Sequence, residues 1–330
     1  MFIMKRNNSE IESSIMRILN VIRRIIHINY KYYLRELYIL LNANNIILTY
    51  PNVKAKDHRV NLLDYDIDKT GHPHYNKDNP YNLGDELGKV VIDWMLEKRA
   101  DLSRDMWVKK KKFLLTIGSG VFYYGYQDVT FWGTGVLCDI HNQPWYRKFL
   151  NSKYYRKLDF RAVRGPLTRD VVQKLGHKCP EIYGDPGILM PLIYKPDVTK
   201  EHDYAIIPQY VTEEEIREQH PDDFIISMNT NDYKKVISDI ISCKKVVSSS
   251  LHGVILAEAY GVPAVWYRGL MEEIDFKYLD YYASTGRYNI QPATSVEEAL
   301  ATEPLPLPDL TKLYKGLLNS FPYDLWTDNQ

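Results

Sequence analysis

Cysteine is scarce in this chain, and neither sign of charge is in excess. Its 330 residues include three cysteines, Cys138, Cys179 and Cys243, which are far apart and odd in number. This argues against a disulfide framework and against a cysteine-based zinc site, and it is typical of a reducing compartment. Lys plus Arg and Asp plus Glu each total 42, so no net charge attracts nucleic acid to the chain.

A long apolar run is also lacking. No stretch approaches the roughly 18 uncharged residues that a membrane span needs, and the first residues do not follow the order of a secretory signal. We therefore expect a cytoplasmic protein that is neither exported nor transmembrane.

What is present suits two α/β domains. The length is about twice that of a typical domain, and 45% of the residues are hydrophobic. From residue 46 onward, strand-like runs alternate with helical ones, which is typical of mainly parallel sheets. The predicted strands are 46–50, 113–117, 129–132, 160–163, 204–208, 224–228, 246–249 and 264–267. The predicted helices are 83–97, 167–175, 233–241 and 254–260.

A polar segment at 194–203, which contains Pro196, suits a linker between the two halves. We therefore predict an α/β fold with two Rossmann-like domains, at 46–195 and 203–330, facing each other across a cleft. Ligands in such folds bind at the carboxyl ends of the strands.

Residues 1–45 form a separate extension. Within it, residues 15–41 combine basic and apolar residues in a helical pattern, which predicts a basic amphipathic helix. Such a helix could lie on an anionic membrane surface as a peripheral contact, or it could pack against the main body of the protein.

The most informative segment is Ser-Ser-Ser-Leu-His-Gly at 248–253. It places small hydroxyl residues and His252 where a buried strand turns into a helix, and a helix start binds phosphate or carboxylate oxygens readily. Gly253 permits close approach of the backbone to a ligand, and His252 can exchange a proton near neutral pH. The alternative is a serine-capped helix with a hydrogen-bonded histidine.

Several other glycine-rich segments fall at predicted strand ends or helix starts. Asn82 is predicted to cap the first helix, with Gly84 presenting amides to an anion and Asp85 able to position or deprotonate a hydroxyl. Two loops, at 118–120 (Gly-Ser-Gly) and 133–135 (Gly-Thr-Gly), lack the helix and acid of a dinucleotide fingerprint.

Arginine and aspartate mark two further turns. Arg164 precedes a Gly-Pro helix start and offers a planar fork that matches carboxylate or phosphate, whereas Arg161 and Arg169 suit surface or packing positions. Asp185 lies in the Gly-Asp-Pro turn at 184–186, where its simplest role is to cap or brace the arginine segment.

Taken in order, these segments resemble the polysaccharide pyruvyl transferase family. The resemblance spans about residues 80–285 and rests on four motifs, at 82–85, 164–169, 184–186 and 250–253, with the continuation at 257–263. The segments 132–135 (Trp-Gly-Thr-Gly) and 280–284 (Asp-Tyr-Tyr-Ala-Ser) resemble the branch of bacterial exopolysaccharide ketal-pyruvate transferases.

The resemblance implies a two-domain fold like that of the GT-B glycosyltransferases and a specific reaction. The enolpyruvyl unit of phosphoenolpyruvate passes to two hydroxyls of one sugar, which gives a cyclic ketal and phosphate in surface polysaccharide biosynthesis. The acceptor would be a saccharide, in particular a lipid-linked repeat unit of a surface polysaccharide, and the enzyme would work in the cytoplasm at the inner face of the membrane. No cofactor and no metal are expected.

The resemblance also implies site roles. His252 would be the general acid that protonates the methylene carbon, and Asp85 would orient or deprotonate the acceptor hydroxyl. The residues expected to bind the donor are Arg164, Ser249, Ser250, Leu251, Gly253 and Arg268. The residues expected on the acceptor side of the cleft are Asn82, Gly84, Gly118, Ser119, Gly133, Thr134 and Asp185.

One position departs from the family pattern. Many relatives carry arginine where this chain has Ser250, so another cation, Arg268 or Arg287, is expected to compensate. A cluster of possible metal ligands, Asp57, His58, His72 and His74, lies in an irregular segment without fixed ligand spacing.

Two other functions remain open. A nucleotide-sugar glycosyltransferase would use the same cleft and would need an acid for the ribose, for which Glu258 is available unless it faces solvent. A non-catalytic carbohydrate-binding scaffold would keep the fold without the chemistry, although Arg164 and His252 argue against it.

Overall fold

The computed structural model describes residues 60–62, 82–99, 112–122, 129–143, 145–269 and 275–326. The chain divides into two compact units, Met1–Thr49 and Tyr50–Gln330, and every described residue belongs to the second. The predicted helix at 15–41 and the predicted strand at 46–50 therefore lie outside the described residues.

The first sheet is parallel throughout. Its strands lie in the order β1 (Val60–Leu62), β2 (Lys112–Leu115), β3 (Thr130–Trp132) and β4 (Asp159–Ala162). All three residues of β3 are buried, as expected for a parallel strand that is covered on both faces. The predicted strands at 113–117, 129–132 and 160–163 are confirmed to within one or two residues at each end.

The second sheet is also parallel and contains β5 (His202–Ile207), β6 (Cys243–Ser248) and β7 (Ala264–Trp266) in that order. The predicted strand at 224–228 is wrong, because only a single bridge joins Ile225 to Ile206. The chain then leaves the sheet, and the carbonyl of Met228 accepts a hydrogen bond from the amide of Leu83.

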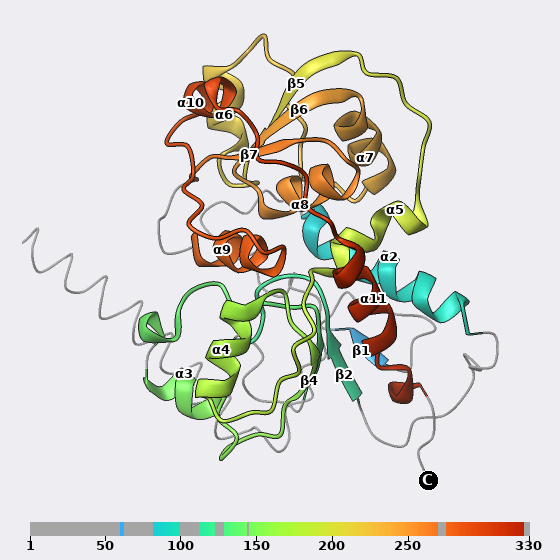
Figure 1. Ribbon diagram of the computed structural model, residues 1–330, viewed down its shortest axis with the longest axis vertical. Coiled ribbons are helices and arrows are strands. Elements are labelled where there is room, and N and C mark those ends of the chain that lie inside the picture. Colours follow the sequence, from blue (N-terminus) through green and yellow to red (C-terminus); the bar gives the residue numbers. More distant parts are fainter. Residues whose placement is uncertain are drawn as a thin grey trace, which may run out of the picture. The chain divides into compact units, whose positions relative to one another are not determined.

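Helices accompany both sheets (Figure 1). Their bounds are α2 (Leu83–Glu97), α3 (Trp145–Leu150), α4 (Pro166–Lys174), α5 (Met190–Ile193), α6 (Glu213–Gln219), α7 (Tyr233–Ile241), α8 (Leu251–Ala259), α9 (Asp275–Ser284), α10 (Val296–Ala301) and α11 (Thr311–Ser320). The predicted helices 83–97 and 233–241 match exactly. Helix α8 begins three residues earlier than predicted, since Ser250 is extended and Leu251 is already helical and buried.

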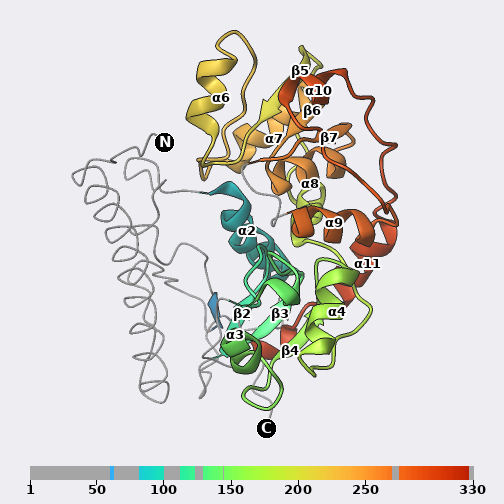
Figure 2. The same cartoon turned by 90° about the vertical axis from the view of Figure 1, so that its left-hand side faces the viewer.

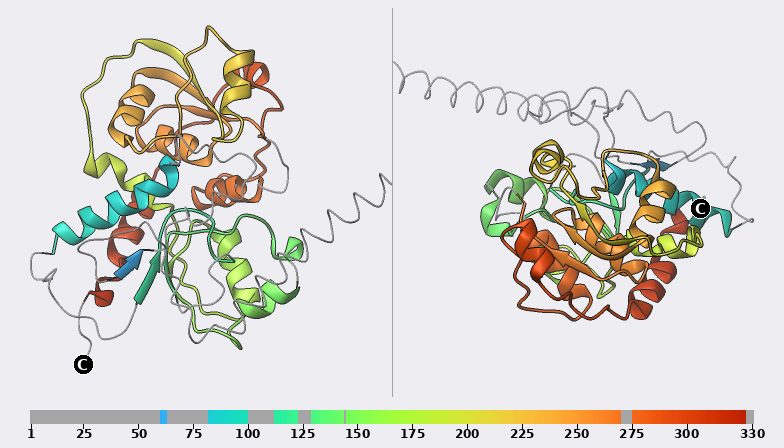
Figure 3. Two further views of the ribbon diagram at one scale, coloured as in Figure 1. Left: turned by 180° about the vertical axis from the view of Figure 1, so that it is seen from behind. Right: turned by 90° about the horizontal axis from the view of Figure 1, so that it is seen from above.

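Elements from the two sheets share one buried core. Side chains from α2, α8 and α9 pack together with residues of both sheets, and Figures 1 and 2 show these three helices between the sheets. The last helix returns to the first sheet, where the indole of Trp132 donates a hydrogen bond to the carbonyl of Leu317 over 3.1 Å. Figure 3 shows α11 from behind and from above.

The structure therefore confirms an α/β protein with parallel sheets, compatible with a Rossmann-like fold. In the described part of the chain, no helix combines the length and the apolarity that crossing a bilayer requires.

Candidate active site

His252 lies against the backbone of Gly84. An ideal Cβ at Gly84 would lie 1.9 Å from Nδ1 of His252, so any larger residue would occupy the place of the imidazole. Helix α2 thus begins directly beside the first turn of α8, and two segments singled out separately in the sequence meet here. Asp85 follows Gly84 in the first turn of α2, and its side chain lies outside the described atoms.

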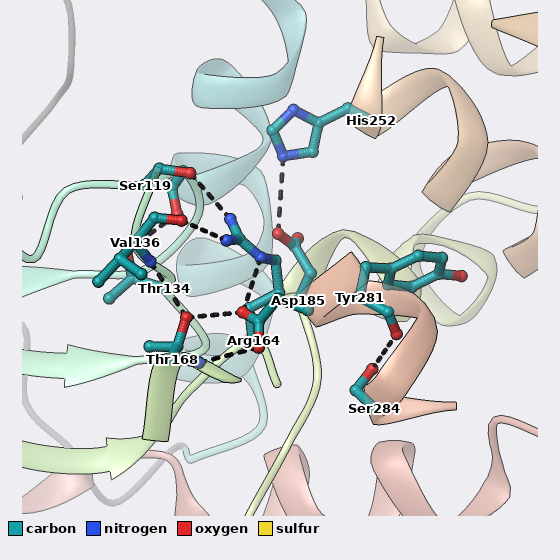
Figure 4. Close-up of polar contacts among 11 residues, drawn as sticks. Ser119, Thr134, Val136, Arg164, Thr168, Asp185, His252, Tyr281 and Ser284 are labelled. Atoms are coloured by element: carbon teal, nitrogen blue, oxygen red, sulfur yellow. Dashed lines mark hydrogen bonds and ion pairs between the residues drawn. The ribbon is translucent and has the colours of Figure 1, made fainter. Parts of the chain in front are cut away.

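The other ring nitrogen of His252, Nε2, points toward Asp185 (Figure 4). Nε2 of His252 lies 3.7 Å from Oδ2 of Asp185, whose side chain is fully buried. Both of these atoms are buried, and neither has a hydrogen-bond partner in the structure. Buried polar atoms are normally hydrogen-bonded. These two atoms therefore have hydrogen-bonding capacity that a ligand can use.

A second contact fixes the Asp185 carboxylate. Its Oδ1 accepts a hydrogen bond from the amide of Gly187 over 2.9 Å and so caps the short 3-10 helix Pro186–Leu189. Asp185 therefore caps its own 3-10 helix rather than the arginine segment that it was predicted to cap or brace, and its contact with His252 was not predicted.

Arg164 is a buried cation whose three guanidinium nitrogens all have partners. Nε donates to Asp280 over 3.2 Å, Nη1 donates to the hydroxyl of Ser119 over 2.8 Å, and Nη2 donates to the carbonyl of Val136 over 2.6 Å. The Arg164 side chain is 0% exposed. Arg164 therefore joins the 118–120 and 133–136 loops to helix α9.

Asp280 completes this network from α9. It accepts hydrogen bonds from both the hydroxyl and the amide of Thr168, at 2.6 and 3.0 Å. Burial raises the pKa of the Asp280 carboxyl, while the neighbouring Arg164 guanidinium opposes that rise. Neither Asp280 nor Thr168 was predicted as a site residue; a carboxylate among the tyrosines of an otherwise buried helix is the signal that could have indicated it.

The two glycine-rich loops lie close to Arg164. Gly118 and Gly133 have φ angles of +99° and +84°, which disfavour side chains, and a Cβ at Gly135 would lie 2.2 Å from Cζ of Arg164. The buried Thr134 hydroxyl donates to the carbonyl of Gly118. The loops therefore pack on the guanidinium, with Ser119 half-buried beside it.

The start of α8 is more internally bonded than the sequence predicts. The hydroxyl of Ser249 is buried and accepts a hydrogen bond from the amide of Gln209, and the hydroxyl of Ser248 bonds the amide of Ser250. A Cβ at Gly253 would lie 2.4 Å from the hydroxyl oxygen of Ser248, so this glycine serves close packing on β6. Leu251 is buried as well.

Ser250 and His252 remain half-buried among the predicted donor-binding residues at this helix start. Asn82 occupies the predicted N-cap position of α2, but its side chain does not make the expected capping hydrogen bond. The first amide of α2 instead donates to the second half of the chain, at Met228.

The two arginines expected to compensate for Ser250 both form ion pairs. Arg268 bonds Asp275, and its side chain is 28% exposed. Arg287 forms a bidentate pair with Glu258, which also accepts a hydrogen bond from the hydroxyl of Tyr281. Glu258 is therefore buried and engaged, so the idea that it faces solvent is wrong.

Metal-ligand clusters can be judged for the described residues only. Within them, no group of three or more His, Cys, Asp or Glu side chains is arranged to hold a metal ion. The candidate ligands Asp57, His58, His72 and His74 lie outside the described residues.

Comparison with known proteins places the chain in a family. An uncharacterized protein of Acanthamoeba polyphaga mimivirus, L143, is 27% identical over 217 residues, which cover 62% of this chain and 71% of that protein. A structure of a functionally uncharacterized Klebsiella pneumoniae protein aligns with 61% of this chain and 83% of its own, at 14% identity and a TM-score of 0.38. The family model for polysaccharide pyruvyl transferase matches residues 54–268, well over half of the chain, and the protein is therefore a member of the polysaccharide pyruvyl transferase family.

Proposed function

We propose that the protein transfers the enolpyruvyl unit of phosphoenolpyruvate to two hydroxyls of one saccharide, forming a cyclic pyruvate ketal and releasing phosphate. The observation that carries the proposal is the pair of His252 and Asp185, with two facing polar atoms that lack partners at the start of α8. Membership of a family of transferases acting on polysaccharide supports it.

The reaction needs a proton donor at carbon. His252, as the imidazolium, gives a proton to the methylene carbon of the donor, and the adjacent carbon becomes an oxocarbenium-like centre that the first hydroxyl attacks. Phosphate then leaves, and the second hydroxyl closes the ketal. The two hydroxyls release two protons, of which one restores His252 and the other leaves with phosphate or solvent.

Asp185 holds the acid in place. Its buried carboxylate attracts the imidazolium 3.7 Å away, and its own position is fixed by the amide of Gly187. Gly84 supports the opposite face of the ring. The ring is thereby oriented by two elements, which is the arrangement that a proton transfer of fixed direction requires.

The donor carries a phosphate and a carboxylate, which need positive partners. The amides at the start of α8 and the half-buried Ser250 suit the phosphate. Arg164 would receive the carboxylate by exchanging the Ser119 hydroxyl on Nη1 for a carboxylate oxygen. Arg268, which is partly exposed, is the further cation that can serve the donor.

Asp85 is proposed to orient or deprotonate the acceptor, because it follows the glycine that touches His252. A lipid-linked acceptor at the inner face of the membrane belongs to the same proposal. The glycosyltransferase alternative loses its ribose-binding acid, since Glu258 is engaged by Arg287 and Tyr281.

The test is incubation of the full chain with phosphoenolpyruvate and a panel of saccharides, with phosphate release and acceptor mass followed in parallel. The proposal expects a ketal product from the wild type. Turnover of nucleotide sugars without use of phosphoenolpyruvate would replace it with the glycosyltransferase function. Binding of saccharides without any turnover across the panel would favour the scaffold.

A further inference from the structure

The segment between β3 and β4 carries aromatic side chains on its outside. Trp145 and Phe149 of α3 are 78% and 52% exposed, and Tyr154 and Tyr155 in the following turn are 84% and 39% exposed. Large aromatic side chains normally lie in cores, and four exposed ones within eleven residues are unusual for a soluble surface.

The same segment places its leucines inside. Leu150 and Leu158 are buried, and the turn is tied to the end of α4 by hydrogen bonds from Lys153 to Leu175 and between His177 and Asn151. The fold could therefore bury apolar residues here and does so with leucine. The aromatic side chains are presented to the outside by an anchored scaffold.

Charge in this segment has one sign. Residues 140–158 contain five Lys or Arg and no Asp or Glu. Lys153 and Lys157 are exposed and Lys148 is half-buried, so these lysines accompany the exposed aromatics. The acid that follows, Asp159, already bonds Arg161 over 2.7 Å. We call Trp145, Phe149, Tyr154, Tyr155 and the lysines Lys148, Lys153 and Lys157 the α3 patch.

We infer that the α3 patch docks the protein on an anionic lipid surface. Tryptophan and tyrosine side chains are favoured at the level of lipid headgroups, where an apolar ring and a polar edge are both accommodated, and the phenylalanine adds apolar surface. Lysines beside them attract anionic headgroups. A neutral saccharide would use the rings but not the positive charge, so the combination favours a membrane. This inference is independent of the proposed reaction and of the 15–41 segment.

The first test is sedimentation of the full chain with phosphatidylcholine vesicles, with and without phosphatidylglycerol. The aromatic variant is Trp145→Ser with Phe149→Ser and Tyr154→Ser, and the lysine variant is Lys148→Gln with Lys153→Gln and Lys157→Gln. The matched control is Tyr288→Ser with Lys312→Gln and Lys315→Gln, since these residues are also exposed but lie elsewhere. Circular dichroism confirms that all variants fold.

We expect tighter binding to the anionic vesicles, unchanged in the control. The lysine variant should bind about a hundredfold more weakly, because each basic residue near an anionic surface contributes roughly a fivefold factor. The aromatic variant should lose about tenfold or more, because it removes apolar surface. Any contribution of residues 1–49 is common to all variants and cancels in these ratios.

Three results would overturn the inference. One is wild-type binding that does not depend on phosphatidylglycerol, and another is patch variants that bind anionic vesicles within twofold of the control. The third is a patch variant that loses binding to an anionic saccharide such as heparin but still binds the vesicles as the wild type does. That result would make the patch a saccharide surface. A direct readout is Trp145 fluorescence, taken as wild type minus Trp145→Phe, which brominated lipids should quench if the residue enters the headgroup layer.

Discussion

Nε2 of His252 faces Oδ2 of Asp185 across 3.7 Å, and both atoms are buried without a hydrogen-bond partner. The two residues are 67 positions apart in the sequence, in the first turn of α8 and before a short 3-10 helix. The amide of Gly187 binds Oδ1 and so fixes the orientation of the carboxylate. Oδ2 therefore points toward His252.

Replacing Asp185 by Asn should remove the negative charge beside His252 without disturbing the fold. The amide oxygen can still cap Gly187, so folding should be preserved, while the charge facing His252 is lost. We expect kcat to fall about a hundredfold or more, by analogy with carboxylates that orient a catalytic histidine. The KM for phosphoenolpyruvate should stay within threefold. A proportional rise in KM with unchanged kcat would instead place Asp185 in donor binding, and Asp203→Asn on the surface serves as the control.

Gly84→Ala should displace the imidazole. A methyl group at this position would overlap Nδ1 of His252 at 1.9 Å, so the ring must move even though alanine itself favours a helix. We expect activity to fall about a hundredfold, as misplacement by about 1 Å does in other sites. Gly316→Ala in α11 is the matched control, because its Cβ would approach a side-chain atom of Ile182 no closer than 3.2 Å. Equal activity in the two variants would contradict the geometry.

Asp280→Asn should destabilise the protein strongly. The change leaves the fully buried Arg164 guanidinium without its carboxylate, and removal of one partner from a buried ion pair costs about 3–5 kcal/mol. Urea unfolding measures this loss. Asp239→Asn breaks an exposed pair with Lys235 and should have only a small effect. Similar midpoints for the two variants would show that Arg164 does not depend on Asp280.

His177 should make stability depend on pH. Burial lowers the pKa of His177 below its ordinary value of 6.5, and the nearby Arg156 and Lys153 lower it further. The folded state therefore disfavours the protonated ring, so its stabilising contribution is present above pH 6.5 and is lost as the pH falls through the lowered pKa.

The measurement is the free energy of unfolding between pH 7 and pH 5, compared in the wild type and His177→Gln. The variant should lose less stability on acidification, because glutamine can donate to Asn151 and does not titrate. The exposed His141 provides the control as His141→Gln, which should behave as the wild type does. Parallel curves for His177→Gln and the wild type would refute the prediction.

The cysteines should differ in reactivity. Burial raises the pKa of the Cys179 thiol to about 12 and also raises that of Cys243, so neither should form much thiolate near neutral pH. Cys138 is partly exposed. Alkylation of the native protein followed by mass spectrometry should label Cys138 first, and rapid labelling of Cys179 would indicate that the core around it opens.

Much of the fold could be predicted because its signals are local. Helix 233–241 carries a strong apolar period and a cap from Asp232 to the amide of Lys235, and helix 83–97 has a similar period. The error at 224–228 arose because an apolar run resembles a strand even where the chain makes only one bridge. Helices α3, α5, α6, α9, α10 and α11 were not predicted. Four of them, α3, α5, α6 and α10, have seven residues or fewer, which is too short to show a helical period.

The site was predicted less completely, because its contacts are long-range. Local motifs indicated His252, Gly84, Arg164 and Asp185 one at a time. Nothing local indicates that Asp185 faces His252 or that Arg164 is neutralised by Asp280, 116 residues further along. The run of serines before the helix likewise predicted a ligand contact at Ser249. In the structure its hydroxyl accepts a hydrogen bond from the amide of Gln209.

The central claim is that His252 protonates the donor carbon, and the most direct measurement is deuterium incorporation during turnover. The protein is incubated in D₂O with phosphoenolpyruvate and an accepted saccharide, and the ketal is analysed by NMR. We predict one deuterium in the product methyl group from the wild type and a rate about 10²–10⁴-fold lower in His252→Gln. A His252→Gln variant that forms the deuterated ketal within threefold of the wild-type rate would contradict the claim.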